Sequence, residues 1–294
     1  NTNITNIIME RTNAYSLLDF LDNSPCNFFA TATIQRYLDD NGFQELKQSE
    51  RWNLEKGGKY YVKKNDTAIF GFVIGETPLD QSGFNMISAH SDSPCFRIKP
   101  NPEMLADGVL KLNTEVYGGP ILYTWFDRPL SLAGRVIVRN PQNPARPITK
   151  LIDFASPVLI IPHLAIHFNR NVNAGNPLSK QKDMLPIAAI VSDSMSKNNF
   201  LIDQIKERLE IADSKDILDF DLMLYNCQKS QLVGFNKEFI CSGRIDDLSM
   251  AHAALSALLN SNNPATTKVM AIFDNEETGS GTKQGAASPV LASI

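Results

Sequence analysis

Cysteine is scarce in this chain of 294 residues, which contains four, at positions 26, 95, 227 and 241. They lie far apart, and none of them belongs to a C-x-x-C pair. This spacing argues against a zinc ribbon and against a disulfide framework, so we expect reduced thiols.

An excess of charge of one sign is also missing, since 28 basic and 32 acidic residues leave a formal net charge of −4. The basic residues are scattered along the chain rather than gathered in a patch. Such a chain has no strong electrostatic field to attract polyanions. We therefore expect neither nucleic acid nor a membrane as a partner.

Long apolar runs are absent as well. The most apolar stretch, residues 157–166, is interrupted by Pro162 and His163 and is far shorter than a membrane span. Charged residues at positions 10, 11 and 19 interrupt the N-terminal segment, which therefore lacks the apolar core of a signal peptide. With 43% hydrophobic and 20% charged residues, the composition is typical of a globular protein, and we expect a cytoplasmic enzyme-sized one.

Hydrophobic periodicity and turn residues predict both helices and strands. Helices are expected near residues 13–21, 28–40, 199–211 and 249–259. Strands are expected at residues 59–62, 68–74, 85–90, 109–114, 130–138, 158–161, 220–225 and 268–273. Residues 169–183 are expected to form a loop, and residues 285–294 to begin a helix.

The order of these elements indicates two domains. From about residue 98 the predicted strands follow one another with few helix signals between them, which indicates a β-rich insert. Near residue 232 the α/β pattern resumes. We predict an α/β catalytic domain made of residues 1–98 and 233–294, with a β-rich domain of residues 99–232 inserted in it.

Three segments place ionisable side chains just after a predicted strand, where open α/β sheets hold their ligands. In the first segment, the spacing of two between His90 and Asp92 puts both on the same side of the chain. His90 could ligate a metal while Asp92 holds its other ring nitrogen. A surface histidine in a polar turn is the alternative, and His-x-Asp alone does not exclude it.

The second segment runs from Arg244 to Asp247, between a predicted strand and a predicted helix. One of its two carboxylates could bridge two cations, whereas Asp247 and Ser249 are better suited to cap the helix. The role of Asp246 stays open on this segment alone.

The third segment, residues 271–281 (AIFDNEETGSG), is the most specific. Adjacent side chains of an extended segment point in opposite directions, so Glu276 and Glu277 could divide metal binding and proton transfer between them. Gly279 and Gly281 would allow a positive φ or a close backbone approach. An acidic, glycine-rich surface loop is the alternative, but it does not explain why an apolar strand should run directly into these residues.

Four segments together resemble the signature segments of aspartyl aminopeptidases, a family of metallopeptidases. They are residues 88–94 (SAHSDSP), 161–167 (IPHLAIH), 242–247 (SGRIDD) and 273–280 (FDNEETGS). Their order and spacing also agree with the family. The resemblance implies that the C-terminal part of the family's sequence, with its remaining metal ligands, lies outside this chain.

The resemblance implies a phosphorylase/hydrolase-like α/β catalytic domain with an inserted β-rich dimerisation domain. It implies two divalent metal ions, with zinc as the first expectation and manganese or cobalt as alternatives. His90 and Glu277 would be metal ligands, and Asp246 would bridge both metals. Glu276 would be the general base for the attacking water, and Asp92 would orient His90.

The activity implied is that of an aminopeptidase, which removes N-terminal residues, acidic ones by the family's name, from peptides with a free N-terminus. Dimers would assemble into dodecamers, and His167 of the insert would steady the tetrahedral intermediate in a neighbouring subunit's site. His163 and His167 are four residues apart, but no Glu lies between them, so a local zinc site is not expected. The alternative function is a catalytically inactive fragment or structural subunit that self-associates through the β-rich insert. A different two-metal amidohydrolase, such as a deacylase, is disfavoured by the four matching segments.

Overall fold

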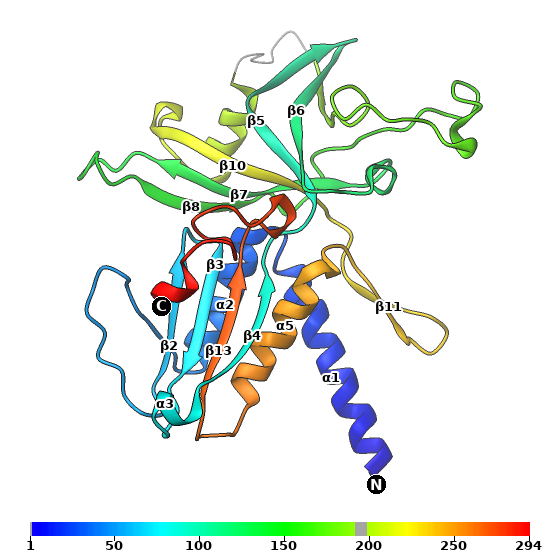
Figure 1. Cartoon of the computed structure of the whole chain (residues 1–294). Coiled ribbons are helices and arrows are strands. Elements are labelled where there is room, and N and C mark those ends of the chain that lie inside the picture. Colours follow the sequence, from blue (N-terminus) through cyan, green and yellow to red (C-terminus); the bar gives the residue numbers. More distant parts are fainter. Residues whose placement is uncertain (1, 192–198) are drawn as a thin grey trace. The chain divides into compact units, whose positions relative to one another are not determined.

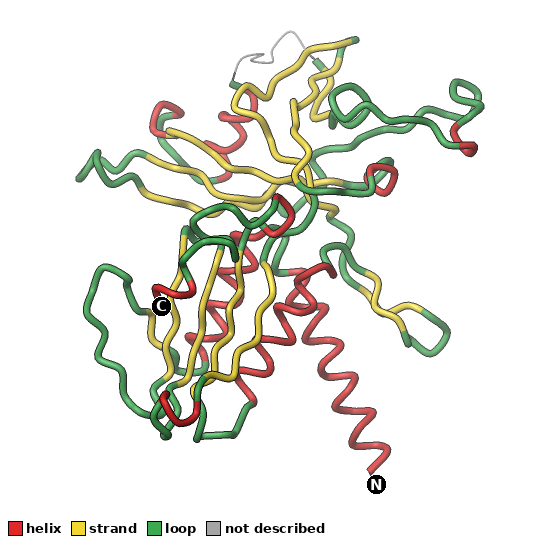
Figure 2. The backbone as a smooth tube through the Cα atoms, viewed as in Figure 1, coloured by secondary structure: helices red, strands yellow, loops and turns green. Residues whose placement is uncertain are grey.

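The computed structural model describes residues 2–191 and 199–294, and the chain divides into two compact units. One unit comprises Asn1–Ser93 and Lys229–Ile294, and the other comprises Pro94–Gln228. The expected domain boundaries, after residues 98 and 232, lie a few residues beyond these divisions. Figure 1 shows the course of the chain, and Figure 2 shows where helices and strands alternate with loops.

The first unit is built on a five-stranded sheet in the order β1-β2-β3-β13-β4. The strands are β1 (Gln44–Glu45), β2 (Lys59–Lys64), β3 (Ala68–Val73), β4 (Phe84–His90) and β13 (Thr267–Phe273). Strands β2 and β3 form the predicted hairpin, whose turn residues Asn65 and Asp66 both have positive φ. Strand β13 is antiparallel to β3 and parallel to β4. Because β13 and β4 are parallel, with Phe273 paired to His90, their C-terminal ends meet at one edge of the sheet.

Three helices lie on one side of this sheet (Figure 1): α1 (Thr2–Asp22), α2 (Asn27–Asp40) and α5 (Ile245–Asn260). Helix α2 buries Ala30, Ile34 and Leu38, which are spaced four residues apart and therefore share one helix face. They pack in one core with Leu255 of α5 and Met270 of β13. The predicted helices at 28–40 and 249–259 are confirmed by α2 and α5. The short helix α3 (Leu79–Ser82) precedes β4.

The opposite face of the sheet carries a smaller cluster, in which Phe70 and Phe273 pack with Val290. The prediction that residues 285–294 begin a helix is wrong. The segment forms turns and ends in the short 3-10 helix η5 (Leu291–Ser293). The hydroxyl of Ser288 accepts a hydrogen bond from the backbone N–H of Val290, which favours a turn there.

The second unit is a six-stranded antiparallel sheet in the order β8-β7-β10-β5-β6-β9. Its strands are β5 (Cys95–Ala106), β6 (Val109–Tyr117), β7 (Leu130–Val138), β8 (Ile148–Asp153), β9 (Ile187–Ile190) and β10 (Ile217–Asn226). Helix α4 (Phe200–Arg208), which confirms the helix expected at 199–211, buries Leu201 and Ile205 against Phe96 and Leu222. The 3-10 helices are η1 (Leu122–Trp125), η2 (Val172–Ala174) and η3 (Ser214–Asp216).

Two strand expectations need correction. Residues 158–161 make only isolated bridges, because Pro157 and Pro162 enclose the segment and neither offers a backbone N–H to a ladder. The strand expected where the α/β pattern resumes near residue 232 is a separate hairpin, in which β11 (Gln231–Val233) pairs with β12 (Phe239–Cys241) in the part of the chain that the structure describes. Across residues 2–191 and 199–294, no helix combines the length and apolarity needed to cross a bilayer.

Candidate metal site

His90 is the last residue of β4, and its ring is held from one side. Its Nδ1 atom lies 3.1 Å from Oδ1 and 3.0 Å from the backbone oxygen of Asp92, whose side chain is only 1% exposed. In the tautomer that donates from Nδ1, the Nε2 lone pair is left for another partner. This is the arrangement that commonly fixes the orientation of a metal-ligating histidine.

Asp246 faces the other ring nitrogen of His90. Its Oδ1 atom lies 3.5 Å from His90 Nε2, and its side chain is 85% exposed. Although it belongs to the first turn of α5, its backbone is not helical (φ −83°, ψ 112°), and a cis peptide bond joins it to Asp247. The hydroxyl of Ser93 donates to its backbone oxygen at 3.0 Å. On the N-terminal side, the Arg244 guanidinium donates to the backbone oxygens of residues 21 and 24, at the end of α1.

Asp247 does not cap α5, which corrects the sequence-based expectation for it and for Ser249. Because Asp246 and Asp247 are both non-helical, the regular part of α5 begins after them, and in the part of the chain that the structure describes neither the Asp247 nor the Ser249 side chain makes a cap hydrogen bond to it. Because Asp247 also has non-helical φ and ψ, its carboxylate turns toward β4, where Oδ2 accepts from the backbone N–H of His90 at 3.1 Å. The same oxygen lies 3.8 Å from His90 Nε2. The only sequence signal for this role was the Asp-Asp doublet.

Glu276 and Glu277 lie on a turn, and not on an extended segment as the sequence predicted. Strand β13 ends at Phe273, Asn275 is left-handed with φ 61°, and residues 276–278 form the 3-10 helix η4 (Glu276–Thr278). The backbone N–H groups of Glu276 and Glu277 donate to Oδ1 and Oδ2 of Asp92 at 3.2 Å and 3.1 Å.

Positive φ occurs after the pair, as expected, at Gly279 (95°). The second left-handed residue, however, is Ser280 (60°) rather than Gly281. The turn therefore depends on more than glycine for its conformation.

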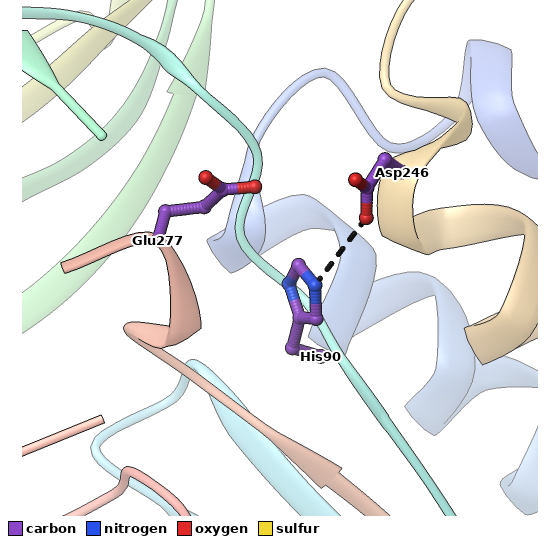
Figure 3. A group of neighbouring side chains, drawn as sticks. All are labelled: His90, Asp246 and Glu277. Carbon is purple, nitrogen blue, oxygen red and sulfur yellow. Dashed lines mark ion pairs between the residues drawn. The ribbon is translucent and has the colours of Figure 1, made fainter. Parts of the chain in front are cut away.

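The three predicted ligands come together in space (Figure 3). His90, Asp246 and Glu277 each offer one ligand atom, and these atoms all lie within 4.8 Å of one another. Two ligands of one tetrahedral zinc ion, each about 2 Å from the metal, are separated by roughly 3.5 Å. The distance of 3.5 Å between His90 Nε2 and Asp246 Oδ1 agrees with that geometry. One imidazole with several carboxylates suits zinc and also tolerates manganese or cobalt.

Glu276 lies beside this group without belonging to it. Its Oε2 atom is 3.7 Å from His90 Nε2, and its side chain is 59% exposed. One carboxylate of the turn thus joins the candidate ligands, and the other reaches the same region from solvent.

The electrostatics of the site favour a cation. Burial alone would lower the pKa of His90, but the hydrogen bond to Asp92 and the carboxylates of Asp92, Asp247 and Glu276 raise that pKa to about 9. Burial raises the pKa of Asp247 and of Glu277. The negative charge that retains a proton on His90 would equally attract a metal ion, so the two compete for Nε2.

His167, the remaining predicted site residue, belongs to the second unit. It lies in an exposed turn after the bridges at residues 159–161. Nearby, His163 packs its ring edge-on against Phe126, with ring centroids 4.6 Å apart. The role of His167 stays a prediction that rests on the resemblance.

Comparison with known proteins identifies the family. The family model described as Aminopeptidase I zinc metalloprotease (M18) matches residues 20–294. This chain belongs to the M18 family. The resemblance to aspartyl aminopeptidases is thereby confirmed at the level of this family, as is the α/β fold class.

Several M18 relatives are similar over nearly the whole chain. A probable M18 family aminopeptidase 2 of Clostridium novyi is 52% identical over 282 residues, which cover 96% of this chain and 65% of the relative. A protein of the same name from Pseudomonas aeruginosa is 39% identical and covers 95% of this chain and 64% of that relative. This M18 chain therefore spans just under two thirds of the length of these relatives.

Solved structures show the same M18 fold. A structure of Chaetomium thermophilum mApe1 superposes with a TM-score of 0.86 at 32% identity, over 95% of this chain and 66% of that one. A cryo-EM structure titled as the Ape4 and Nbr1 complex gives a TM-score of 0.90 at 33% identity, over 96% and 58% of the two chains.

Proposed function

We propose that this chain carries the metal-binding part of an aminopeptidase that removes N-terminal residues, preferentially Asp or Glu, from peptides. The observation that carries the proposal is the convergence of the His90 ring with the carboxylates of Asp246 and Glu277, with Glu276 beside them. The M18 family description as a zinc metalloprotease supports zinc as the metal. The number of ions is proposed as two, with Asp246 shared between them, and manganese or cobalt could replace zinc.

The residues of the chain divide the chemistry between them. A bound divalent cation supplies Lewis acidity, which polarises a carbonyl group and lowers the pKa of water. Asp92 holds Nδ1 of His90 and so keeps Nε2 directed at the site. The exposed carboxylate of Glu276 would accept the proton of the attacking water and return it to the leaving amine.

The free α-amino group of a peptide would be held beside the same carboxylates, which restricts cleavage to the first residue. The preference for acidic residues comes from the resemblance alone. Self-association into dimers and dodecamers, with His167 serving a neighbouring subunit, is proposed on the same basis, as is a cytoplasmic location.

The substitution Glu276→Gln tests the proposal. It removes the base but keeps the size of the side chain, so turnover of Asp- and Glu-p-nitroanilide should fall by about 100-fold or more, while zinc affinity is retained. Glu50→Gln, which changes an exposed glutamate of the same unit, is the matched control and should leave turnover unchanged. Turnover by Glu276→Gln at the parent rate would show that the base is wrongly assigned.

The parent chain itself separates the proposal from its alternative. Measured zinc content with turnover supports the enzyme. A chain that binds no zinc but forms dimers or larger assemblies by light scattering would support the inactive, self-associating fragment instead.

A further inference from the structure

Strand β13 is followed by a buried carboxyl group that the proposed chemistry does not use. Asp274 is 1% exposed and comes two residues before Glu276. Burial raises the pKa of this carboxyl, although hydrogen bonds, including one from Asn27, oppose the rise. Because burying an ionisable group costs free energy, an apolar residue would be the less costly choice here. The role of Asp274 therefore depends on the groups to which it is hydrogen-bonded.

Two buried amides bind this carboxyl. Asn27 Nδ2, on the first turn of α2, donates to Oδ1 at 3.0 Å, and Gln284 Nε2 donates to Oδ2 at 3.4 Å. Gln284 also donates to Asn275 Oδ1 at 2.9 Å, and its backbone oxygen accepts from the N–H of Asp274 at 3.2 Å. Asn27 is 3% exposed and Gln284 7%. Gln284 thus closes the loop of residues 274–284, and Asn27 ties that loop to helix α2.

The turn enclosed by this loop needs such support. Asn275 and Ser280 have φ of 61° and 60°, the left-handed region, which asparagine tolerates but which serine adopts only at a cost in free energy. From the β4 side, Asp92 accepts the backbone N–H groups of Glu276 and Glu277. The turn is therefore anchored from two directions, by Asp92 just after β4 and by Asn27 of α2.

We propose that Asn27, Asp274 and Gln284 form a positioning cluster that fixes the turn bearing Glu276 and Glu277 and thereby sets the metal affinity of the site. The inference rests on the proposed function only through the metal site. No member of the cluster is assigned a contact with substrate, so these are positioning residues rather than catalytic ones.

Cobalt titration of the 294-residue chain, followed by the visible absorption of the bound ion, tests the proposal. Gln284→Ala should bind Co²⁺ about tenfold more weakly than the parent, as expected for loss of a group that orients a ligand. The matched control is Gln35→Ala in the same unit. Gln35 also joins two side chains, donating to the Tyr61 hydroxyl at 3.1 Å and accepting from Lys63 Nζ at 2.8 Å. This control should change Co²⁺ affinity by less than about twofold.

An exchange of groups provides the second variant. Asn27→Asp alone places two carboxyl groups against each other and should weaken Co²⁺ binding by about tenfold or more. Adding Asp274→Asn again pairs one amide with one carboxylate, with the amide now at position 274 and the carboxylate at position 27. The double variant should therefore bind Co²⁺ with an affinity within about threefold of the parent's. Thermal melting of every variant shows which are folded.

The outcomes are separable. Weak binding by Gln284→Ala and Asn27→Asp, with recovery in the exchanged pair, supports the positioning cluster. Parent-like affinity in folded Gln284→Ala, or failure of the folded exchanged pair to recover, overturns it. Failure of the parent chain to bind Co²⁺ at all would instead overturn the proposed function, and it would be recognised before any variant is made.

Discussion

Replacing Asp92 by Asn tests the link between the histidine and the carboxylate turn. Three N–H donors converge on this carboxylate: His90 Nδ1 and the backbone of Glu276 on Oδ1, and the backbone of Glu277 on Oδ2. Asparagine keeps only one acceptor oxygen, and its NH2 group must then face at least one of these donors. The substitution therefore removes at least one hydrogen bond and creates a donor-donor contact at a side chain that is only 1% exposed.

The size of the effect follows from these contacts. A hydrogen bond to a charged acceptor contributes about 1.5–3 kcal/mol, so the free energy of unfolding should fall by about that amount. Loss of a group that orients a metal ligand typically weakens metal binding about 10–100-fold. Zinc titration by calorimetry, together with urea unfolding, measures both quantities.

Asp153→Asn is the matched control, because Asp153 also accepts two hydrogen bonds, from the Tyr225 hydroxyl at 2.7 Å and the backbone of Ala155 at 2.8 Å, but belongs to the second unit. Both bonds go to Oδ1, which asparagine can keep, so this substitution removes the charge without removing an acceptor and should leave zinc affinity unchanged. Zinc binding by Asp92→Asn as tight as that of the parent would refute the reasoning, whatever happens to stability.

Two further predictions concern the fold of the first unit. Leu255→Ala truncates a side chain that is 2% exposed and should lower the free energy of unfolding by about 2–5 kcal/mol. Met250, on the same helix, is 54% exposed, so Met250→Ala should change the free energy of unfolding by less than about 0.5 kcal/mol. Urea unfolding measures both changes. Burial lowers the pKa of His252, which hydrogen-bonds Ser16 at 2.9 Å, so the unfolded chain binds its proton more readily. The contribution of His252 to stability should therefore be present above about pH 6.5 and decrease as the pH falls below that value. In His252→Gln, the free energy of unfolding should depend less steeply on pH below that value. An equal slope in both proteins would contradict this.

Local patterns were sufficient for several elements of the first unit. The hairpin of β2 and β3 follows from its turn residues, and α2 from the four-residue spacing of Ala30, Ile34 and Leu38. The hairpin at residues 231–241 was misread because a short alternating strand looks the same whether it joins a main sheet or pairs with its neighbour.

The supporting contacts of the site could not be predicted, because they join distant parts of the chain. Asp247 accepts from His90 across 157 residues, and Asn27 donates to Asp274 across 247. An Asp at the start of a helix is commonly a cap, and only the three-dimensional path of β4 shows that Asp247 serves another purpose. His90, Asp246 and Glu277 were identifiable only because four separate segments resembled one family.

The central claim is that His90, Asp246 and Glu277 form a metal site, and an anomalous difference map from a zinc-soaked crystal of this chain tests it most directly. The account predicts a zinc peak at bonding distance, about 2 Å, from His90 Nε2 and from carboxylate oxygens of Asp246 and Glu277. A map without a peak at these three residues, or with zinc bound only elsewhere on the chain, would contradict it.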